Sequence, residues 1–485
     1  MRADVSILTS ALVEVRMRLW IEWFKVVAQL RPACARTRTY LWMGLVLMGL
    51  SIRADAAGVT SFVRVLGLAP SVYHRLLHLF HSRALHLDRL TALWTRWCRD
   101  AFPAFTVGPF RVCLADGLKV AKEGRQMPAV KKLHQVSDNN SKPPFIFGHS
   151  FQAISLLTRT ATGGAAAVPL AARIHEGVVW SNRDQRTLLD KLVLLFLSVA
   201  ATLESAVVLV ADAYYASRKV ILPLLAAGHH LVSRARINAV AYQPARPPNR
   251  RRRGRPRLYG TRVRLRDLLR ESAAFTSVPS PVYGENDLCI AYRCVDLLWR
   301  PVGRLVRFVL VHHPVRGSII LLCTDLTMDP LDILILYAYR YKIELGFRHA
   351  LHVVGTYAYH FWMMAMTPIP RRRGNQYMHH RSERYRQQVR RKLAAYHTHV
   401  QLGCIAQGLL QYLAITCSAT VWQLFRSWLR TMHTNRPPSE LVVAHALRSS
   451  LPEFLAAGPL DAIRAKFLRD RIYARADQPP QRIAA

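Results

Sequence analysis

Two uninterrupted apolar runs, each closed by an aspartate, constrain the fold most strongly. They are "PFRVCLADG" (109–117), which contains Asp116, and "SAVVLVADAYYAS" (205–217), which contains Asp212. Continuous Val/Leu runs of this length predict strands that are buried on both faces and covered by helices. The segment 184–204, "DQRTLLDKLVLLFLSVAATLE", lies between further strand-like runs and predicts a long helix. This alternation predicts a mixed α/β fold.

The two aspartates are the first candidate functional residues. In an open α/β sheet, ligands bind at the carboxyl ends of the strands, and both acids are expected there. Acids at strand ends also serve simply as turn formers, and this reading stays open for each of them alone. Asp325 follows another predicted strand and is the main competing acid.

A third acid, Glu344, stands alone in the basic and aromatic segment "LYAYRYKIELGFRHA" (336–350). If this segment is one helix, Tyr337, Arg340 and Glu344 share a face. Glu344 is then either a surface residue paired with Arg340 or Arg348, or one of three acids that meet in space. Three neighbouring carboxylates repel one another unless cations hold them, and two divalent ions roughly 3.5–4 Å apart would do so. Such a pair activates water for in-line displacement at phosphorus.

Charge indicates the partner. The chain has 68 Lys and Arg against 29 Asp and Glu, a net charge of +39. A protein this positive binds a polyanion, nucleic acid first and an acidic membrane surface second. The best apolar run, 39–52, is shorter than the ~20 residues that span a membrane, and the N-terminus lacks the pattern of a signal peptide. We therefore expect a cytoplasmic protein. The eight cysteines form no CxxC pair and are interpreted as buried thiols.

The chain divides into five predicted parts. Residues 1–108 are helical, and 58–82 reads as helix, turn, helix with Gly67 in the link and Ser71 as the cap of the second helix. That pair is either a DNA-reading unit or an ordinary helical hairpin. The other parts are a first core segment (109–235), a basic linker with β-strands (236–328), a second core segment (329–432) with a basic linker (371–392), and a helical tail (433–485).

Three stretches of this sequence resemble one family. "ADGLKVAKEG" and "LVADAYYAS" resemble its two aspartate regions, and "YAYRYKIELGF" carries the spacing Tyr-x2-Arg-x3-Glu. The family is the DDE transposases of bacterial insertion sequences, in the subgroup whose third motif reads Tyr-x2-Arg-x3-Glu-x6-Lys, the insertion-sequence-four family. The resemblance covers roughly residues 50–450. The final Lys of the motif falls on Leu351, with Arg348 and His349 nearby.

The resemblance implies a ribonuclease-H-like catalytic core with a mainly β insertion, and an N-terminal helical DNA-binding domain. It implies that Asp116, Asp212 and Glu344 bind two Mg²⁺ ions, which Mn²⁺ can replace, with Arg340 and Tyr337 in the same site. The implied activity is DNA cleavage and strand transfer on double-stranded DNA, at terminal inverted repeats and at target DNA. A dimer on DNA, no membrane partner and a nucleoid-associated location follow from the same resemblance.

Two other functions stay open: a nuclease with the same core, and a non-catalytic or degenerate DNA-binding protein. Leu351 at the lysine position keeps the degenerate copy open. Trp299 and His149 are interpreted as core residues. "RRGRPR" (252–257) is either an AT-hook-like minor-groove segment or a solvated basic linker. The residues expected to contact DNA are Lys119, Lys122, Arg253, Arg255, Arg257 and Arg348, together with Lys131 and Lys132.

Overall fold

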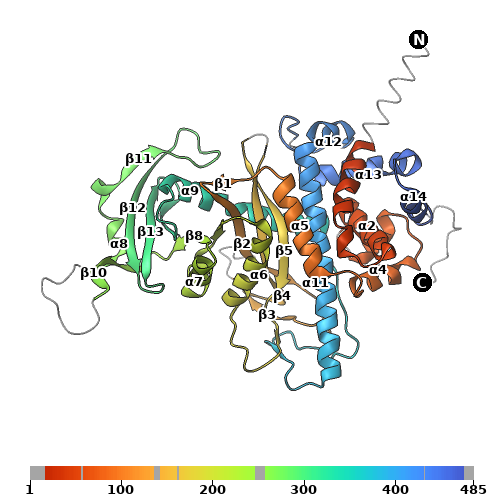
Figure 1. The fold of residues 1–485 in the computed structure, drawn as a ribbon, viewed down its shortest axis with the longest axis horizontal. Coiled ribbons are helices and arrows are strands. Elements are labelled where there is room, and N and C mark those ends of the chain that lie inside the picture. The colour runs from red at the N-terminus through yellow and green to blue at the C-terminus, as the bar shows by residue number, and fades with distance from the viewer. Residues whose placement is uncertain are drawn as a thin grey trace, which may run out of the picture.

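The computed structural model describes residues 17–55, 58–135, 143–160, 163–245, 257–430 and 432–473. Figure 1 shows an elongated molecule with a β-rich end, a central sheet covered by helices, and a helical end. Helices from residues 17–101 and from 440–469, far apart in sequence, share the helical end. The α/β character expected from the sequence is confirmed, with a large mixed sheet.

The central part of the sheet contains the four strands predicted around the two aspartates, together with β8, which was not predicted. Their spatial order is β5-β4-β2-β7-β8. β7 and β8 run parallel to β2, whereas β4 is antiparallel to both of its neighbours, β2 and β5. The bounds are β2 (Phe110–Ala121), β4 (Phe145–Arg159), β5 (Ala165–Ile174), β7 (Val207–Ala211) and β8 (His230–Ala235).

Helices cover both faces of this sheet, as its apolar strands require. On one face, α9 (Pro330–Tyr339) and α10 (Tyr341–His349) bury Ile333 and Ile343 against Leu114 of β2 and Val210 of β7. On the other face lie α5 (Leu87–Ala101), α6 (Leu188–Leu203) and α11 (Glu383–Thr416). All five residues of β7 are buried, which explains its unbroken Val/Leu composition.

The strands of the segment 236–328 extend the same sheet instead of forming a separate one. β14 pairs with β8, β13 pairs with both β14 and β12, and β9 and β10 complete that edge. Figure 1 places these strands at the end of the molecule farthest from the termini. Their bounds are β9 (Val240–Pro244), β10 (Tyr259–Arg264), β11 (Thr276–Pro279), β12 (Cys289–Trp299), β13 (Arg304–His313) and β14 (Gly317–Cys323).

The helix-turn-helix expected at 58–82 is present as two short helices. They are α3 (Val59–Val65) and α4 (Val72–Phe80), and Gly67 turns the chain between them with φ +57°. The expected cap is wrong, because Ser71 occupies the N-cap position without a side-chain hydrogen bond. α4 buries Leu76, Leu79 and Phe80, and its His74, Arg75 and His78 are exposed.

The second basic segment was expected to be a linker over 371–392, and its second half is instead helical. α11 begins at Glu383, where the Ser382 hydroxyl accepts a hydrogen bond from the N–H of Tyr385. α11 stops at Thr416, and α12 (Ser418–Leu424) follows after a 99° bend. In the part of the chain that the structure describes, no single helix is both long and apolar enough to span a membrane; only the bent pair α11 and α12 passes that test of length and composition when taken together.

The remaining helices build the helical end of the molecule. α2 (Thr37–Ile52) is buried along nearly its whole length, and Trp20 and Trp23 of the helix over 17–29 are fully buried beside it. α13 (Glu440–Ala457) and α14 (Ala462–Arg469) from the C-terminal part pack against α2. One continuous apolar core joins these helices to α11 and the central sheet.

Candidate active site at the carboxyl end of β7

Asp116 and Asp212 lie side by side on neighbouring parallel strands. The last register pair between β2 and β7 is Ala115 with Ala211, and each aspartate is the next residue on its strand. Asp212 ends β7, and its Oδ1 accepts a hydrogen bond from the N–H of Tyr214 at 2.9 Å. Asp116 does not end its strand as expected, because β2 continues to Ala121 through its pairing with β4.

Arg340 connects the third acid to this pair. Its Nη1 lies 3.1 Å from Oδ2 of Asp116, and its Nη2 lies 2.8 Å from Oε1 of Glu344. The single helix expected for this segment is divided at Arg340, where α9 ends and α10 begins, although the Arg340 backbone itself is helical. Arg340 therefore lies at the junction of α9 and α10, and its guanidinium contacts Asp116 of β2 and Glu344 of α10.

The carboxylates of Asp212 and Glu344 interact electrostatically with that of Asp116, which is partly buried. Burial raises the pKa of Asp116 to about 6; the Gly117 N–H and Arg340 oppose this rise, and the charges of Asp212 and Glu344 add to it. Burial lowers the pKa of Arg340, but its two carboxylate partners raise it more. The side chain of Asp116 is 17% exposed and that of Glu344 is 53% exposed. Glu344 thus forms the solvent side of the cluster.

The cluster fits a divalent metal ion in part. Asp116 and Asp212 offer neighbouring carboxylate oxygens, the donors that hard cations such as Mg²⁺ prefer. Within the described ranges, no group of three or more His, Cys, Asp or Glu side chains is arranged to hold a metal ion. The Arg340 guanidinium supplies the positive charge between Asp116 and Glu344. Glu344 could bind a metal ion together with the two aspartates only after its ion pair with Arg340 breaks.

Comparison with known families identifies the superfamily. The sequence model described as DDE superfamily endonuclease matches residues 29–279, slightly more than half of the chain. The chain belongs to the DDE superfamily of endonucleases. The match includes Asp116 and Asp212 and ends before Glu344, so the third acid depends on the geometry alone. A comparison with curated proteins gives no significant match.

Two tyrosines lie beside the candidate acids and Arg340. Tyr337 is half-buried, and its ring centroid lies 6.0 Å from the Arg340 guanidinium carbon. Tyr215, which the sequence analysis missed, is buried beside Asp116 and Asp212 and hydrogen-bonds to Gln152. Burial and then the charges of the two aspartates raise the pKa of Tyr215 far above its ordinary value. The aromatic pair that directly follows Asp212 in "ADAYY" was the available signal.

Asp325, the competing acid, lies at the opposite edge of the sheet. β14 runs antiparallel to β8, so the residues that follow β14 pair near the start of β8, where the Thr324 N–H bonds to the carbonyl of Leu231. The Asp325 carboxylate accepts hydrogen bonds from the N–H and hydroxyl of Thr327, as a turn former does. Asp325 therefore lies apart from the candidate site at Asp116 and Asp212.

Leu351 stands where the motif that the sequence resembles has its lysine. Leu351 is half-buried in a π-helical turn (Ala350–Val354) that follows α10. His349 is occupied elsewhere, since its Nδ1 lies 2.7 Å from a carboxylate oxygen of the buried Glu440. Arg348 is exposed, so it is the nearby cation that is accessible to a ligand.

The residues expected to contact DNA fall into three groups. Lys119 and Arg257 are exposed, as Arg348 is. The prediction that Lys122 contacts DNA is wrong. Lys122 is only 4% exposed, and its Nζ donates to the carbonyls of Tyr357 and Tyr359. Burial lowers its pKa to about 7. Arg253 and Arg255, with most of "RRGRPR", lie outside the described residues.

Four other predicted residues can be placed directly. Trp299 and His149 are buried, which agrees with their interpretation as core residues. Lys131 forms an ion pair with Glu176 at 2.8 Å, and the Lys132 ammonium lies 3.8 Å from the centre of the Phe145 ring.

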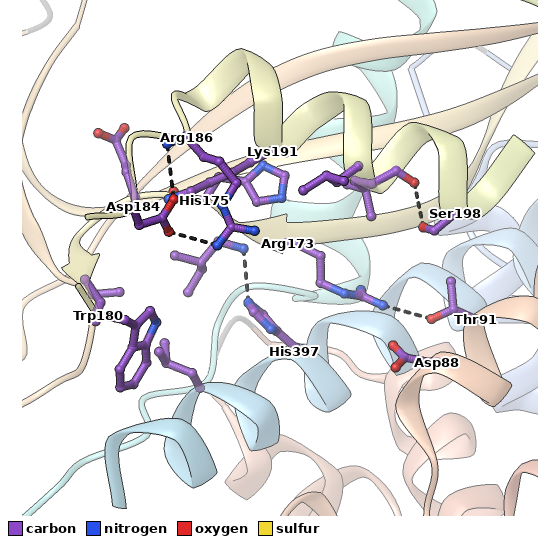
Figure 2. Close-up of a pocket in the computed structure, with 17 residues that line it drawn as sticks. Asp88, Thr91, Arg173, His175, Trp180, Asp184, Arg186, Lys191, Ser198 and His397 are labelled. Carbon is purple, nitrogen blue, oxygen red and sulfur yellow. Dashed lines mark hydrogen bonds and ion pairs between the residues drawn. The ribbon is translucent and has the colours of Figure 1, made fainter. Parts of the chain in front are cut away.

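A separate pocket of about 490 Å³ opens at the end of β5, between α5, α6 and α11 (Figure 2). Its polar groups bind one another: Arg173 donates to Thr91 at 2.8 Å, Arg186 pairs with Asp184 at 2.8 Å, and His397 accepts the N–H of Ile174 at 3.1 Å. Asp116, Asp212 and Glu344 do not line it. The polar side chains that line the pocket connect β5 with the surrounding helices, and the pocket is not part of the candidate active site.

Proposed function

We propose that this chain is a DNA transposase that binds the ends of its insertion sequence and performs metal-dependent strand cleavage and strand transfer. The observation that carries the proposal is the adjacency of Asp116 and Asp212 on paired parallel strands, with Glu344 joined to Asp116 through Arg340. A cluster of carboxylates can bind the metal ions that catalyse reactions of phosphodiesters. The net charge of +39 on the rest of the chain favours binding of the DNA substrate.

The strand order supports the proposed ribonuclease-H-like core. Numbered along the chain, the five central strands occur in the order 3-2-1-4-5, with the second strand antiparallel to the first. The first strand carries Asp116, and the fourth is followed by Asp212. The strands β9 to β14 then form the proposed insertion, and the helices before residue 108 form the proposed DNA-binding part.

Asp116, Asp212 and Glu344 would hold the proposed pair of Mg²⁺ or Mn²⁺ ions. When bound, the ions lower the pKa of the attacking water and stabilise the charge on the phosphorane-like transition state. Asp116 must lose its proton first, because a carboxylate and not a carboxylic acid is the ligand. Arg340 must release Glu344, and its freed guanidinium can then hold a DNA phosphate in a bidentate manner.

The bond changes balance without an external oxidant or energy source. A water oxygen attacks a phosphodiester, the bond to the 3′-oxygen breaks, and the proton passes through solvent to the leaving oxygen. The freed 3′-hydroxyl then attacks a phosphodiester of the target DNA and displaces another 3′-oxygen. Because two element ends act together, a dimer on DNA is part of the proposal.

The test is Mg²⁺-dependent cleavage and joining of a duplex carrying the element's end. Asp116→Asn, Asp212→Asn and Glu344→Gln should each lower the cleavage rate by at least about 100-fold, while the affinity for DNA stays within about twofold. The matched control is Asp325→Asn, which should cleave normally. Joined products separate a transposase from a nuclease. Full activity of Glu344→Gln would remove Glu344 from the site, and activity without any divalent metal would contradict the whole proposal.

A further inference from the structure

One turn exposes apolar side chains to an unusual degree. Residues 361–366, "FWMMAM", which we call the wedge turn, follow the π-helical segment and precede α11. Met364 is 95% exposed and Trp362 is 53% exposed. Their neighbours Phe361, Met363 and Met366 are buried. Exposing a Met and a neighbouring Trp to water is unfavourable, because their apolar surfaces gain no packing contacts. Such exposure is typical of a surface that binds a partner.

The wedge turn is held rigidly by the chain that follows β2. The Met363 N–H donates to the carbonyl of Gln126 at 3.0 Å, and the Gln126 side chain donates to the carbonyl of Met366 at 2.8 Å. Nearby, Arg125 and Ile369 exchange two hydrogen bonds, at 2.9 and 3.0 Å. Met363 and Met366 fill a small core with Met127 and Val130. The two exposed side chains are therefore presented on a fixed frame.

Lys122 completes this frame. Its buried ammonium donates to the carbonyls of Tyr357 and Tyr359, just before the turn. A buried amine that bonds only to main-chain carbonyls of one loop fixes the path of that loop. This explains why a lysine that was expected to contact DNA is turned inward.

The surroundings of the wedge turn are cationic. Arg371, Arg372 and Arg373 follow it and are exposed, and so is Arg125 of the supporting segment. Arg371 forms a surface ion pair with Glu123 at 2.8 Å; the structure gives no acidic partner to the side chains of Arg372 and Arg373 in the described ranges. Apolar side chains surrounded by arginines are complementary to DNA. The arginines can contact the phosphates, and the apolar side chains can insert between adjacent base pairs.

We propose that Trp362 and Met364 insert at a base step of the DNA duplex and unstack it, away from the candidate catalytic acids. β2, the strand that carries Asp116, leads directly into the segment that supports the wedge turn through Arg125 and Gln126. The inference rests on the proposed function, because it names how the same DNA is engaged beyond the cleavage site.

The test compares two 30-bp duplexes, one fully paired and one with a central two-base mismatch, without divalent metal so that no cleavage occurs. A wedge prefers the mismatched duplex, because its bases are already partly unstacked. We expect the wild-type protein to bind it roughly fivefold or more tightly than the paired one. The double variant Trp362→Ala/Met364→Ala should lose this preference and keep its affinity for paired DNA within about twofold, since the arginines are unchanged.

Trp428→Ala is the matched control. Trp428 is 77% exposed and follows α12, which Figure 1 places at the opposite end of α11 from the wedge turn. This variant should keep the preference. Equal binding of both duplexes by the wild-type protein, or an unchanged preference in the double variant, would overturn the wedge and leave the transposase proposal standing. No binding to either duplex would contradict the transposase proposal itself. A change of oligomeric state in the double variant without DNA would assign the turn to a protein contact and also overturn the wedge.

Discussion

The guanidinium of Arg340 lies 3.1 Å from the carboxylate of Asp116, although 224 residues separate them in the chain. The same guanidinium holds Glu344 at 2.8 Å. An arginine with two carboxylate partners neutralises a cluster that would otherwise repel itself. In the proposed transposase, this arrangement keeps the acids together before DNA and metal arrive.

Replacing Arg340 should change both the rate of cleavage and its dependence on pH. Arg340 lowers the pKa of Asp116, so Arg340→Gln raises that pKa further and moves the acidic limb of the pH–rate profile to higher pH. We expect the cleavage rate at pH 8 to fall by about 10–100-fold. Arg340→Lys keeps the positive charge but cannot contact both carboxylates with one planar group. Its cleavage rate should therefore lie between those of the wild-type protein and Arg340→Gln. A profile of Arg340→Gln with an unchanged midpoint would contradict the contact.

Asp116→Asn should stabilise the fold at alkaline pH while it abolishes cleavage. The pKa of Asp116 is about 6 in the folded protein and about 3.9 in an unfolded chain, so the unfolded state binds fewer protons between these values. Stability is therefore lost as the pH rises through this window. The asparagine has no charge to bury, and we expect a gain of roughly 1–3 kcal/mol at pH 8. Thermal melts of both proteins should converge toward pH 4; an equal gain at both pH values would contradict this origin.

Lys119 and Lys122 should differ in DNA binding despite their proximity in sequence. Lys119 is exposed, whereas Lys122 is buried and bonded to two carbonyls. Lys119→Met should reduce the slope of log affinity against log salt by about 1. Lys122→Met should leave that slope unchanged and alter the thermal stability instead. Equal losses of salt slope in the two variants would mean that Lys122 reaches DNA.

Two glycines of buried helices should respond in opposite directions to alanine. A Cβ at Gly408 of α11 would lie 2.2 Å from Cζ2 of Trp94, whereas a Cβ at Gly44 of α2 meets nothing within 4 Å. Gly408→Ala should therefore lower the free energy of unfolding by about 1–3 kcal/mol through overpacking. Gly44→Ala should raise it by roughly 0.5–1 kcal/mol, because alanine favours the helix. Urea denaturation of both variants measures the difference.

The sequence alone determined the fold class and the two aspartates. Runs such as 205–211 are apolar without alternation, which suits only a strand buried on both sides, and β7 is such a strand. The same runs placed Asp116 and Asp212 at one edge, because neighbouring parallel strands present their carboxyl ends together. The spacing of Arg340 and Glu344 likewise follows from helical geometry, since i and i+4 share a face.

Only the tertiary structure decided which side chains are available. Lys119 and Lys122 look equivalent in the sequence, and the packing of the loop at Tyr357 and Tyr359 buries one of them. Asp325 has the sequence context of a catalytic acid, but the antiparallel direction of β14 brings it to the wrong edge. The exposure of Trp362 and Met364 depends on contacts with residues more than 200 positions away, which no local pattern encodes. Burial and strand direction are properties of long-range pairing, so they had to come from the fold.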